Sequence, residues 1–188
     1  MPQPSDTVPD AVKIVVAGGF GAGKTTLVAA LSEIQSLHTE ELIGPHGGDL
    51  LSQADGKTTT TVALDFGRVT LDERTIIYLF GAPGQDRFSF MWDDLARGAL
   101  GAIVLVDTRR LEECFSTIDY FEGRGVPFIV AVNVFADAKT FPAADVRGAL
   151  AVDPDVPVTL CDARDRTSVN RAVVELVSHV LERELAGA

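Results

Sequence analysis

The sequence predicts an α/β fold in which one mostly parallel sheet is covered by helices on both faces. Short apolar segments alternate along the chain with amphipathic segments of helical period, which is the pattern of strands joined by helical crossovers. Two of the apolar segments, 102–107 and 128–133, are apolar up to their last residue, as expected of strands buried on both faces. At 188 residues the chain is expected to form one domain.

The strands are read from short apolar runs. The first run, 12–17, is β-branched and ends at a group of glycines. The polar triplet 72–74 joins two further runs, which predicts a hairpin, whereas helical segments separate the remaining runs. The predicted strands are 12–17, 62–71, 75–80, 102–107, 128–133 and 156–160.

Four segments have helical character, namely 25–34, 110–123, 143–150 and 168–185. In the last of them Val169, Val173, Leu176 and Val180 recur every three or four residues and form one apolar stripe. Residues 44–60 are rich in Gly, Ser, Asp and Thr without periodicity, so a long loop is expected there. Loops of that length inside a compact domain are usually functional.

The charge balance limits the expected partners. The chain holds 27 acidic and 16 basic residues, a net charge of −11 at neutral pH. Nucleic acid and anionic membrane surfaces both attract excess Lys and Arg, so neither is expected to bind. No apolar run approaches the ~20 residues of a membrane span. We expect residues 1–10 to be a flexible polar tail, with no signal peptide or membrane anchor, and we expect a cytoplasmic location.

The strongest motif lies between the first strand and the first helix. Residues 18–25 read Gly-Gly-Phe-Gly-Ala-Gly-Lys-Thr, which fits the phosphate-binding pattern GxxxxGK[ST] in its strand–loop–helix context. The backbone N–H groups of such a loop surround phosphate oxygens, and the positive end of the following helix adds to the attraction. The residues expected to contact the nucleotide here are Gly18, Phe20, Gly21, Ala22, Gly23, Lys24, Thr25 and Thr26.

Two side chains of this loop carry the expected chemistry. Lys24 would reach the β- and γ-phosphates, and the Thr25 hydroxyl would ligate Mg²⁺, a hard cation that prefers oxygen. The motif alone does not distinguish an ATPase, a kinase and a GTPase.

Four further segments resemble the motifs of Ras-like and Rab-like small GTPases. Residues 61–66 (TVALDF) are similar to switch I and the second strand, and 80–85 (FGAPGQ) to the switch II motif Asp-x-x-Gly-Gln. Residues 130–133 (VAVN) resemble the strand before the base motif Asn-Lys-x-Asp, and 161–164 (CDAR) resemble the Ser-Ala-Lys segment. The resemblance implies a three-layer P-loop NTPase fold of the small GTPase type. It further implies a mostly parallel six-stranded sheet with one antiparallel edge strand, in a single G domain over residues 1–188.

A narrower resemblance is to the small GTPases encoded in actinobacterial conservon operons, which are related to the bacterial polarity GTPases. It rests on TTTVALDFG at 59–67, LFGxPGQ at 79–85 and CDAR at 161–164. This resemblance implies a bacterial signalling switch, a regulator protein of the roadblock class and a separate effector protein.

The resemblance also assigns roles in the two switch segments. Thr61 would bind Mg²⁺ through its hydroxyl and the γ-phosphate through its backbone. The threonines at 58–60 leave this register open by one residue, and a plain Thr run entering a strand is the alternative. Gly84 would donate its N–H to the γ-phosphate, and Gln85 would orient the attacking water. A surface turn residue is the alternative for Gln85.

Two departures from the small GTPase pattern bear on hydrolysis. Gly81 stands where switch II has its Mg²⁺-linked aspartate, so the metal is expected to bind more weakly or through waters. Phe20 replaces a small residue and would crowd an arginine supplied by an activating protein. Arg68 and Arg87 are both candidates for stabilising charge in cis, and the sequence does not select between them.

A third departure concerns the base. Residues 133–137 read NVFAD, so the lysine is absent and Ala136 stands where an aspartate would bind guanine. Asp137 would take over if the loop shifts by one residue, since a buried bidentate contact is what rejects the wrong base. Asn133, the backbone N–H of Ala163 and Arg164 complete the expected base site.

Two further features have two interpretations each. Phe88, Phe90, Met91 and Trp92 are either core residues or a partner surface beside switch II. Asp107 is either a Mg²⁺-linked carboxylate or a structural one, and the small GTPase pattern favours the structural role.

The sequence therefore predicts a protein that binds GTP and GDP with Mg²⁺ and acts as a switch, with slow GTP hydrolysis in which Lys24 and Gln85 are the catalytic residues. The alternatives are a nucleotide-binding module that has lost hydrolysis and an ATP-using protein such as a small kinase. The kinase is disfavoured because 44–60 contains only Lys57 and no arginine-rich lid.

Overall fold

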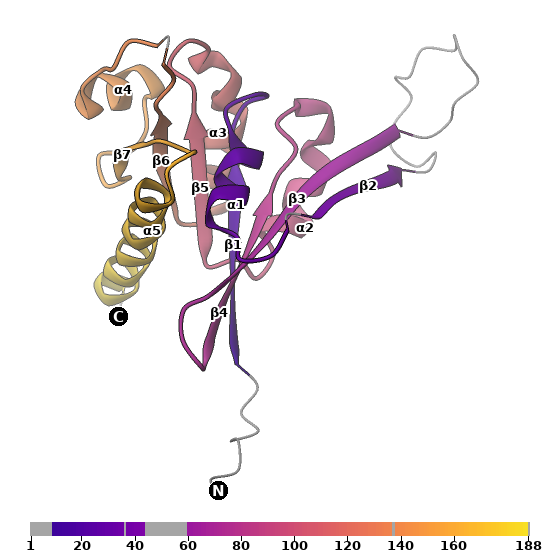
Figure 1. Ribbon diagram of the computed structural model, residues 1–188. Coiled ribbons are helices and arrows are strands. Elements are labelled where there is room, and N and C mark those ends of the chain that lie inside the picture. The colour runs from indigo at the N-terminus through magenta and orange to yellow at the C-terminus, as the bar shows by residue number, and fades with distance from the viewer. Residues whose placement is uncertain (1–8, 36, 44–59, 137, 188) are drawn as a thin grey trace, which may run out of the picture.

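The computed structural model describes residues 9–35, 37–43, 60–136 and 138–187 (Figure 1). They form one seven-stranded sheet in the order β2-β3-β4-β1-β5-β6-β7. β3 is antiparallel to both β2 and β4, and every other neighbouring pair is parallel. The predicted α/β fold class is confirmed.

The elements have the following bounds. The strands are β1 (Asp10–Ala17), β2 (Leu37–Ile43), β3 (Thr60–Thr70), β4 (Thr75–Gly81), β5 (Gly101–Val106), β6 (Phe128–Asn133) and β7 (Val158–Cys161). The helices are α1 (Lys24–Leu31), α2 (Trp92–Ala96), α3 (Phe115–Arg124), α4 (Ala143–Leu150) and α5 (Arg166–Gly187). Two short 3-10 segments, η1 (Asp86–Met91) and η2 (Leu111–Cys114), precede α2 and α3.

All six predicted strands and the hairpin are present, but the sheet has a seventh strand. β2 pairs with β3 from Leu37 opposite Phe66 to Ile43 opposite Thr60, so the antiparallel strand β3 lies inside the sheet and β2 forms the edge. Residues 37–43 read LHTEELI, which has neither an alternating nor a continuous apolar pattern, so pairing with β3 decides their structure. Most of the predicted tail 1–10 and loop 44–60 lies outside the described residues, at 1–8 and 44–59, while Asp10 begins β1 and Thr60 begins β3.

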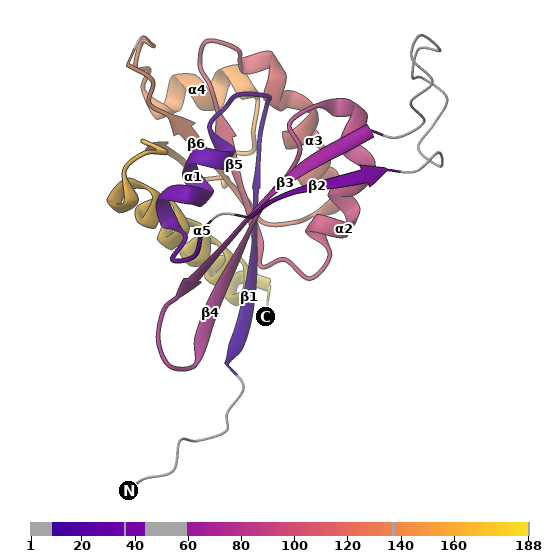
Figure 2. The same cartoon turned by 45° about the vertical axis from the view of Figure 1, so that its right-hand side comes forward.

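Helices cover both faces of the sheet (Figure 2), and an apolar layer on each face holds them to it. Alternate residues of a strand point to opposite faces. In β5, Ile103 and Leu105 therefore pack with residues of α1 and α5, while Ala102, Val104 and Val106 pack with residues of α2, α3 and α4. All six residues of β5 are buried, which confirms that the central strands are covered on both sides.

This topology brings the loops that carry the sequence motifs to one end of the sheet. β1, β4, β5, β6 and β7 are mutually parallel, so their carboxyl ends lie along the same edge, where ligands of open α/β sheets bind. The loops that follow these strands contain the phosphate motif, switch II, Asp107, the base motif and residues 162–164. Within the part of the chain that the structure describes, we find no helix with the length and apolar content to span a bilayer.

Candidate nucleotide-binding site

The loop between β1 and α1 has the backbone that a phosphate cradle needs. Gly18, Gly21 and Gly23 have φ angles of 129°, 73° and 105°, in the left-handed region that favours glycine. A Cβ at Gly18 would collide with the backbone oxygen of Leu105, and one at Gly23 would lie 2.5 Å from the side-chain nitrogen of Asn133. The loop is therefore pressed against β5 and β6 and takes this form only with glycine at these positions.

Lys24 lies at the centre of the cradle. Its Nζ donates to the carbonyl oxygens of Gly18 at 2.9 Å and Gly19 at 2.6 Å. Burial lowers the pKa of Lys24 to about 8, an effect opposed by the negative charges of Asp65 and Glu113. An ammonium held in this way has few water contacts, so phosphate oxygens are favourable partners for it.

Switch II meets the cradle at Gly84. A Cβ at Gly84 would collide with Lys24 Nζ and would lie 2.8 Å from the backbone carbon and oxygen of Gly19. Glycine thus allows the switch II backbone to touch the lysine that is expected to hold the phosphates. Gln85 follows at the start of η1, half-buried, and its backbone oxygen accepts a bond from the N–H of Phe88 at 2.9 Å.

The Thr25 hydroxyl has a partner that the sequence did not indicate. It donates to Asp65 Oδ2 in β3 at 2.6 Å. The two residues present hard oxygens, which suit Mg²⁺, at the place where the predicted ligand Thr25 lies. Among the described residues no group of three or more His, Cys, Asp or Glu side chains gathers as a metal cluster. Mg²⁺ bound with nucleotide typically has only one or two carboxylates and completes its shell with phosphates and water, so the residues present fit it.

The backbone of Thr61 lies nearer the start of β3 than that of Asp65. Its backbone lies in β3 opposite Leu42, and its side chain lies outside what the structure describes. Four residues of extended strand separate it from Asp65, which corresponds to ~13 Å. A contact from Thr61 to a metal at Thr25 would therefore need the start of β3 to move.

The base side of the site is organised by Asn133. Its Nδ2 donates to the Ala22 oxygen at 2.8 Å, and its Oδ1 accepts from the Ala163 N–H at 3.1 Å. The N–H predicted to bind a guanine oxygen is thus bonded to Asn133. The other predicted base residue, Asp137, lies outside the described residues, and Ala136 is exposed. Arg164 forms an ion pair with Asp162 at 2.9 Å.

Asp107 has the structural role that the small GTPase pattern favoured. Its buried carboxylate accepts two bonds from the Arg109 guanidinium, at 2.9 and 2.8 Å, and hydrogen bonding by Arg109 lowers its pKa. The guanidinium of Arg109 in turn lies 3.9 Å from the ring centroid of Phe135 in the base motif. The carboxylate therefore positions Arg109 against Phe135, in the segment where base binding is predicted.

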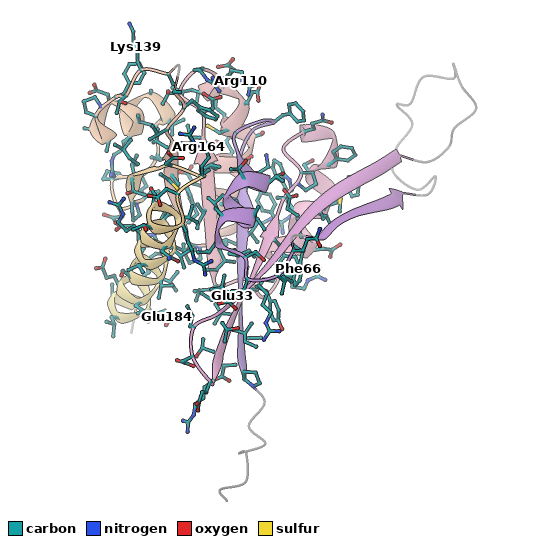
Figure 3. The ribbon with its side chains drawn as sticks, in the orientation of Figure 1. Glu33, Phe66, Arg110, Lys139, Arg164 and Glu184 are labelled. Atoms are coloured by element: carbon teal, nitrogen blue, oxygen red, sulfur yellow. The ribbon has the colours of Figure 1, made fainter. Side chains whose placement is uncertain are left out.

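Another arginine, Arg110, contacts the backbone of the phosphate loop. Arg110 Nη2 donates to the Phe20 oxygen at 3.0 Å, and its Nη1 pairs with Glu113 at 3.0 Å. Figure 3 shows Arg110 and Arg164 at the end of the sheet where the loops gather. Of the two arginines predicted as candidates in cis, Arg68 lies three residues beyond Asp65 on β3 and points to the opposite face. The side chain of Arg87 lies outside what the structure describes.

The exposed residues of the loop and the aromatic cluster complete the site. The Phe20 side chain is 63 % exposed, and Thr25 and Thr26 lie at the surface at the start of α1. Trp92 is buried, stacks edge-on against Tyr120 at 5.3 Å and donates its indole N–H to the Pro83 oxygen at 3.3 Å. Phe90 is 53 % exposed. The cluster thus divides into a core residue, Trp92, and a surface residue, Phe90.

Comparison with known proteins gives relatives for most of the chain. A family model described as "conserved hypothetical ATP binding protein" matches residues 16–183. The uncharacterized protein MJ1339 of Methanocaldococcus jannaschii is 32 % identical over 126 residues, 66 % of this chain and 70 % of that protein. A thymidylate kinase of Halalkalibacterium halodurans is 30 % identical over 76 % of this chain and 65 % of its own length. The Ras-related protein Rab-32C of Dictyostelium discoideum is 23 % identical over 91 % of this chain and 74 % of its own.

Solved structures share the fold. The G domain of the T. maritima iron transporter FeoB superposes with a TM-score of 0.59 at 21 % identity, covering 92 % of this chain and 98 % of that one. The FeoB G domain of Methanococcus jannaschii gives a TM-score of 0.59 at 14 % identity, covering 91 % and 98 %. The T. maritima cytosolic domain in a GDP form gives 0.65 at 18 % identity, covering 92 % and 64 %. These likenesses show that the chain has the fold of a G domain.

Proposed function

This chain belongs to the family of conserved hypothetical ATP binding proteins, and we propose that it is a nucleotide-operated switch that binds GTP and GDP with Mg²⁺. The observation that carries the proposal is the contact of Gly84 with Lys24 and the phosphate loop. A terminal phosphate that enters this contact must displace or engage the switch II backbone. The presence of that phosphate is thereby communicated to η1 and to the surface around Phe90.

The residues of the site have distinct roles in this proposal. Lys24 and the N–H groups of residues 18–24 bind the phosphates and stabilise the charge that develops during transfer. The Thr25 hydroxyl holds Mg²⁺, which when bound neutralises phosphate charge, and Thr61 joins it in the triphosphate state. Gln85 orients the attacking water. Hydrolysis is slow and is not accelerated by an external arginine, because Phe20 crowds the approach of such a residue.

The choice of guanine rests on likeness to other proteins. One relative is named as Ras-related, and solved domains of the same fold are described in GDP and GMPPNP forms. An ATP-binding protein is the second candidate, since the family is described by ATP and Val134 and Ala136 replace the base-motif lysine and aspartate. The thymidylate kinase relative makes phosphate transfer to an acceptor a form of this second candidate.

The nucleotide that copurifies with the protein tests the choice of base directly. It is released by heat, identified by anion-exchange chromatography, and compared with calorimetric titrations of GDP and ADP. We expect GDP to copurify and to bind more tightly, and a Lys24→Ala variant to lose most of the affinity for either. Tighter binding of ADP would replace the guanine proposal by the ATP-binding one.

Hydrolysis is tested separately by single-turnover kinetics. We expect Gln85→Ala to slow GTP hydrolysis at least ~10-fold, since a positioned group of this kind contributes that much or more. Asn170→Ala, at an exposed position of α5, is the matched control. If wild type and Gln85→Ala hydrolyse at the same rate, the protein is a nucleotide-binding module without catalysis.

The partners follow from the same proposal. A roadblock-type regulator and an effector protein would bind the switch surface, where the half-exposed Phe90 offers an apolar contact. A cytoplasmic location and a bacterial signalling role are proposed on the same resemblance. A pull-down with the protein loaded with GDP or with a non-hydrolysable GTP analogue tests the proposed partner surface. We expect Phe90→Ala to weaken capture of partners in the triphosphate state.

A further inference from the structure

Position 81, where switch II lacks its carboxylate, has a carboxylate residue as its cross-strand neighbour. Gly81 is the last residue of β4, and its partner across the antiparallel ladder is Asp65 of β3. Side chains of directly opposed residues lie on the same face and within contact distance. A Cβ at Gly81 would lie 2.8 Å from Asp65 Cβ and 3.0 Å from Asp65 Oδ2. The Asp65 carboxylate therefore occupies space that a side chain at position 81 would fill.

The face on which Asp65 lies is the one that carries the phosphate site. Residues 65, 67 and 69 of β3 share a face. A Cβ at Gly67 would lie 2.9 Å from Val28 Cγ1 in α1, and Val69 packs in the core cluster with residues of α1. Asp65 is thus directed toward the N-terminal end of α1, where it accepts the bond from the Thr25 hydroxyl at 2.6 Å.

From these contacts we infer that Asp65 supplies, from β3, the carboxylate that positions Mg²⁺ at Thr25, in place of the one that position 81 lacks. The inference rests on the proposed function, since it needs nucleotide bound with Mg²⁺. It assigns Asp65 as a positioning residue that acts through Thr25 and the water shell of the metal. Gly81 is then required for a steric reason, because any side chain there would press on Asp65.

The response of nucleotide release to Mg²⁺ tests this role. The probe is a fluorescent analogue of the diphosphate, GDP or ADP, that binds more tightly, and its dissociation is followed at increasing Mg²⁺ and in EDTA. We expect Asp65→Asn, which keeps the shape but removes the charge, to weaken the apparent Mg²⁺ affinity by ~10-fold or more. In EDTA its release rate should equal that of the wild type, because the phosphate loop is intact. An unchanged Mg²⁺ response in Asp65→Asn would overturn the inference.

A reciprocal exchange provides a second, independent test. Asp65→Gly should lose the Mg²⁺ response, and Asp65→Gly/Gly81→Asp should recover part of it, since removing the Cβ at 65 makes room for the aspartate at 81. Asp65→Gly/Gly81→Asn is the matched control without the charge and should not recover. Failure of the folded Asp65→Gly/Gly81→Asp protein to recover any response would refute the equivalence of the two positions.

Failure of this inference is distinguishable from failure of the proposed function. If wild-type protein binds neither GDP nor ADP, both the proposed function and the inference about Asp65 are wrong. If wild type binds nucleotide with a clear Mg²⁺ response that Asp65→Asn retains, the proposed function stands and the inference about Asp65 falls.

Discussion

Asn133 joins the phosphate side and the base side of the site through two buried hydrogen bonds. Its amide bonds to the Ala22 oxygen and the Ala163 N–H, and both of those residues are almost fully buried. Asn133→Ala would leave two buried polar groups without a partner, each at a cost of ~1–3 kcal/mol. We expect a clear loss of stability in urea denaturation without nucleotide. Asn170→Ala, at an exposed position of α5, should change stability by less than ~0.5 kcal/mol. Equal midpoints for the two variants would contradict the structural role of Asn133.

The lowered pKa of Lys24 predicts that the protein takes up protons when it binds nucleotide. Burial lowers its pKa to about 8, so at pH 8 about half of the molecules hold a neutral amine. Phosphate oxygens favour the charged form, so nucleotide binding at pH 8 should take up about half a proton, and more at pH 9. Calorimetry in buffers of different ionisation enthalpy measures this uptake. Lys24→Arg, which cannot titrate in this range, should abolish it, and an uptake that persists in that variant would point to another group.

The lowered pKa of Lys24 also makes the stability of the fold depend on pH. Between pH 8 and 10.5, its ordinary pKa, the unfolded chain binds more protons than the folded one. Stability contributed by this group therefore rises with pH across that window and is lowest below pH 8. Bound nucleotide favours the charged form of Lys24, so it should flatten this rise.

At the residue scale, local motifs were predictable and cross-strand contacts were not. The phosphate loop could be placed because eight consecutive residues carry its whole pattern. Asp65 lies in the segment TVALDF that resembles switch I, yet its link to Thr25 and to Gly81 depends on the register of β3 against β4. Arg110 contacts Phe20 from 90 residues away, which no local spacing indicates.

At the element scale, switch II connects the nucleotide site to the core through one indole. Trp92 is the only tryptophan of the chain, and its N–H donates to the oxygen of Pro83, the residue before Gly84. A change at Gly84 should therefore alter the surroundings of Trp92. We expect the intrinsic fluorescence to differ between the GDP state and the state with a non-hydrolysable GTP analogue. Trp92→Phe serves as the blank, and identical spectra for the two bound states would contradict the coupling.

The elements that sequence reasoning missed are short or depend on their partners. β2 has no apolar pattern and forms by pairing with β3, and α2 has only five residues, too few for a helical period to be recognised. The strands β5 and β6 and the helix α5 were predictable because each carries its own uninterrupted pattern of burial. Elements with their own apolar pattern were thus readable from sequence, whereas the edge strand β2 and the short helix α2 were not.

At the scale of the whole molecule, the excess of negative charge and the binding of an anion are compatible. The net charge is −11, but the described phosphate loop presents backbone N–H groups, a helix N-terminus and Lys24. Raising the salt concentration screens the long-range repulsion between nucleotide and protein, while the close contacts are screened much less. We expect association of nucleotide to become faster with salt in stopped-flow measurements, with dissociation nearly unchanged. A marked slowing of association with salt would show that a positive field around the site dominates.

Substitutions in helix α5 can test whether core packing and nucleotide binding contribute independently to stability. Leu176 is fully buried, and its Cδ1 packs so close to Gly101 in β5 that a Cβ there would lie 2.9 Å away. Leu185, on the same helix, is 80 % exposed. Leu176→Ala should cost ~2–5 kcal/mol, because it leaves a cavity between α5 and the sheet. Leu185→Ala should change stability by less than ~0.5 kcal/mol.

The ligand then separates packing from binding. Nucleotide at a hundred times its dissociation constant should add ~2.7 kcal/mol to each variant and to the wild type alike. That equality is expected because Leu176 packs against Gly101 at the amino end of β5, whereas the phosphate loop follows the carboxyl end of β1. Thermal unfolding of the three proteins with and without GDP measures both terms. A smaller gain for Leu176→Ala would mean that the packing of α5 also shapes the nucleotide site, through the loop of residues 162–165 that precedes the helix.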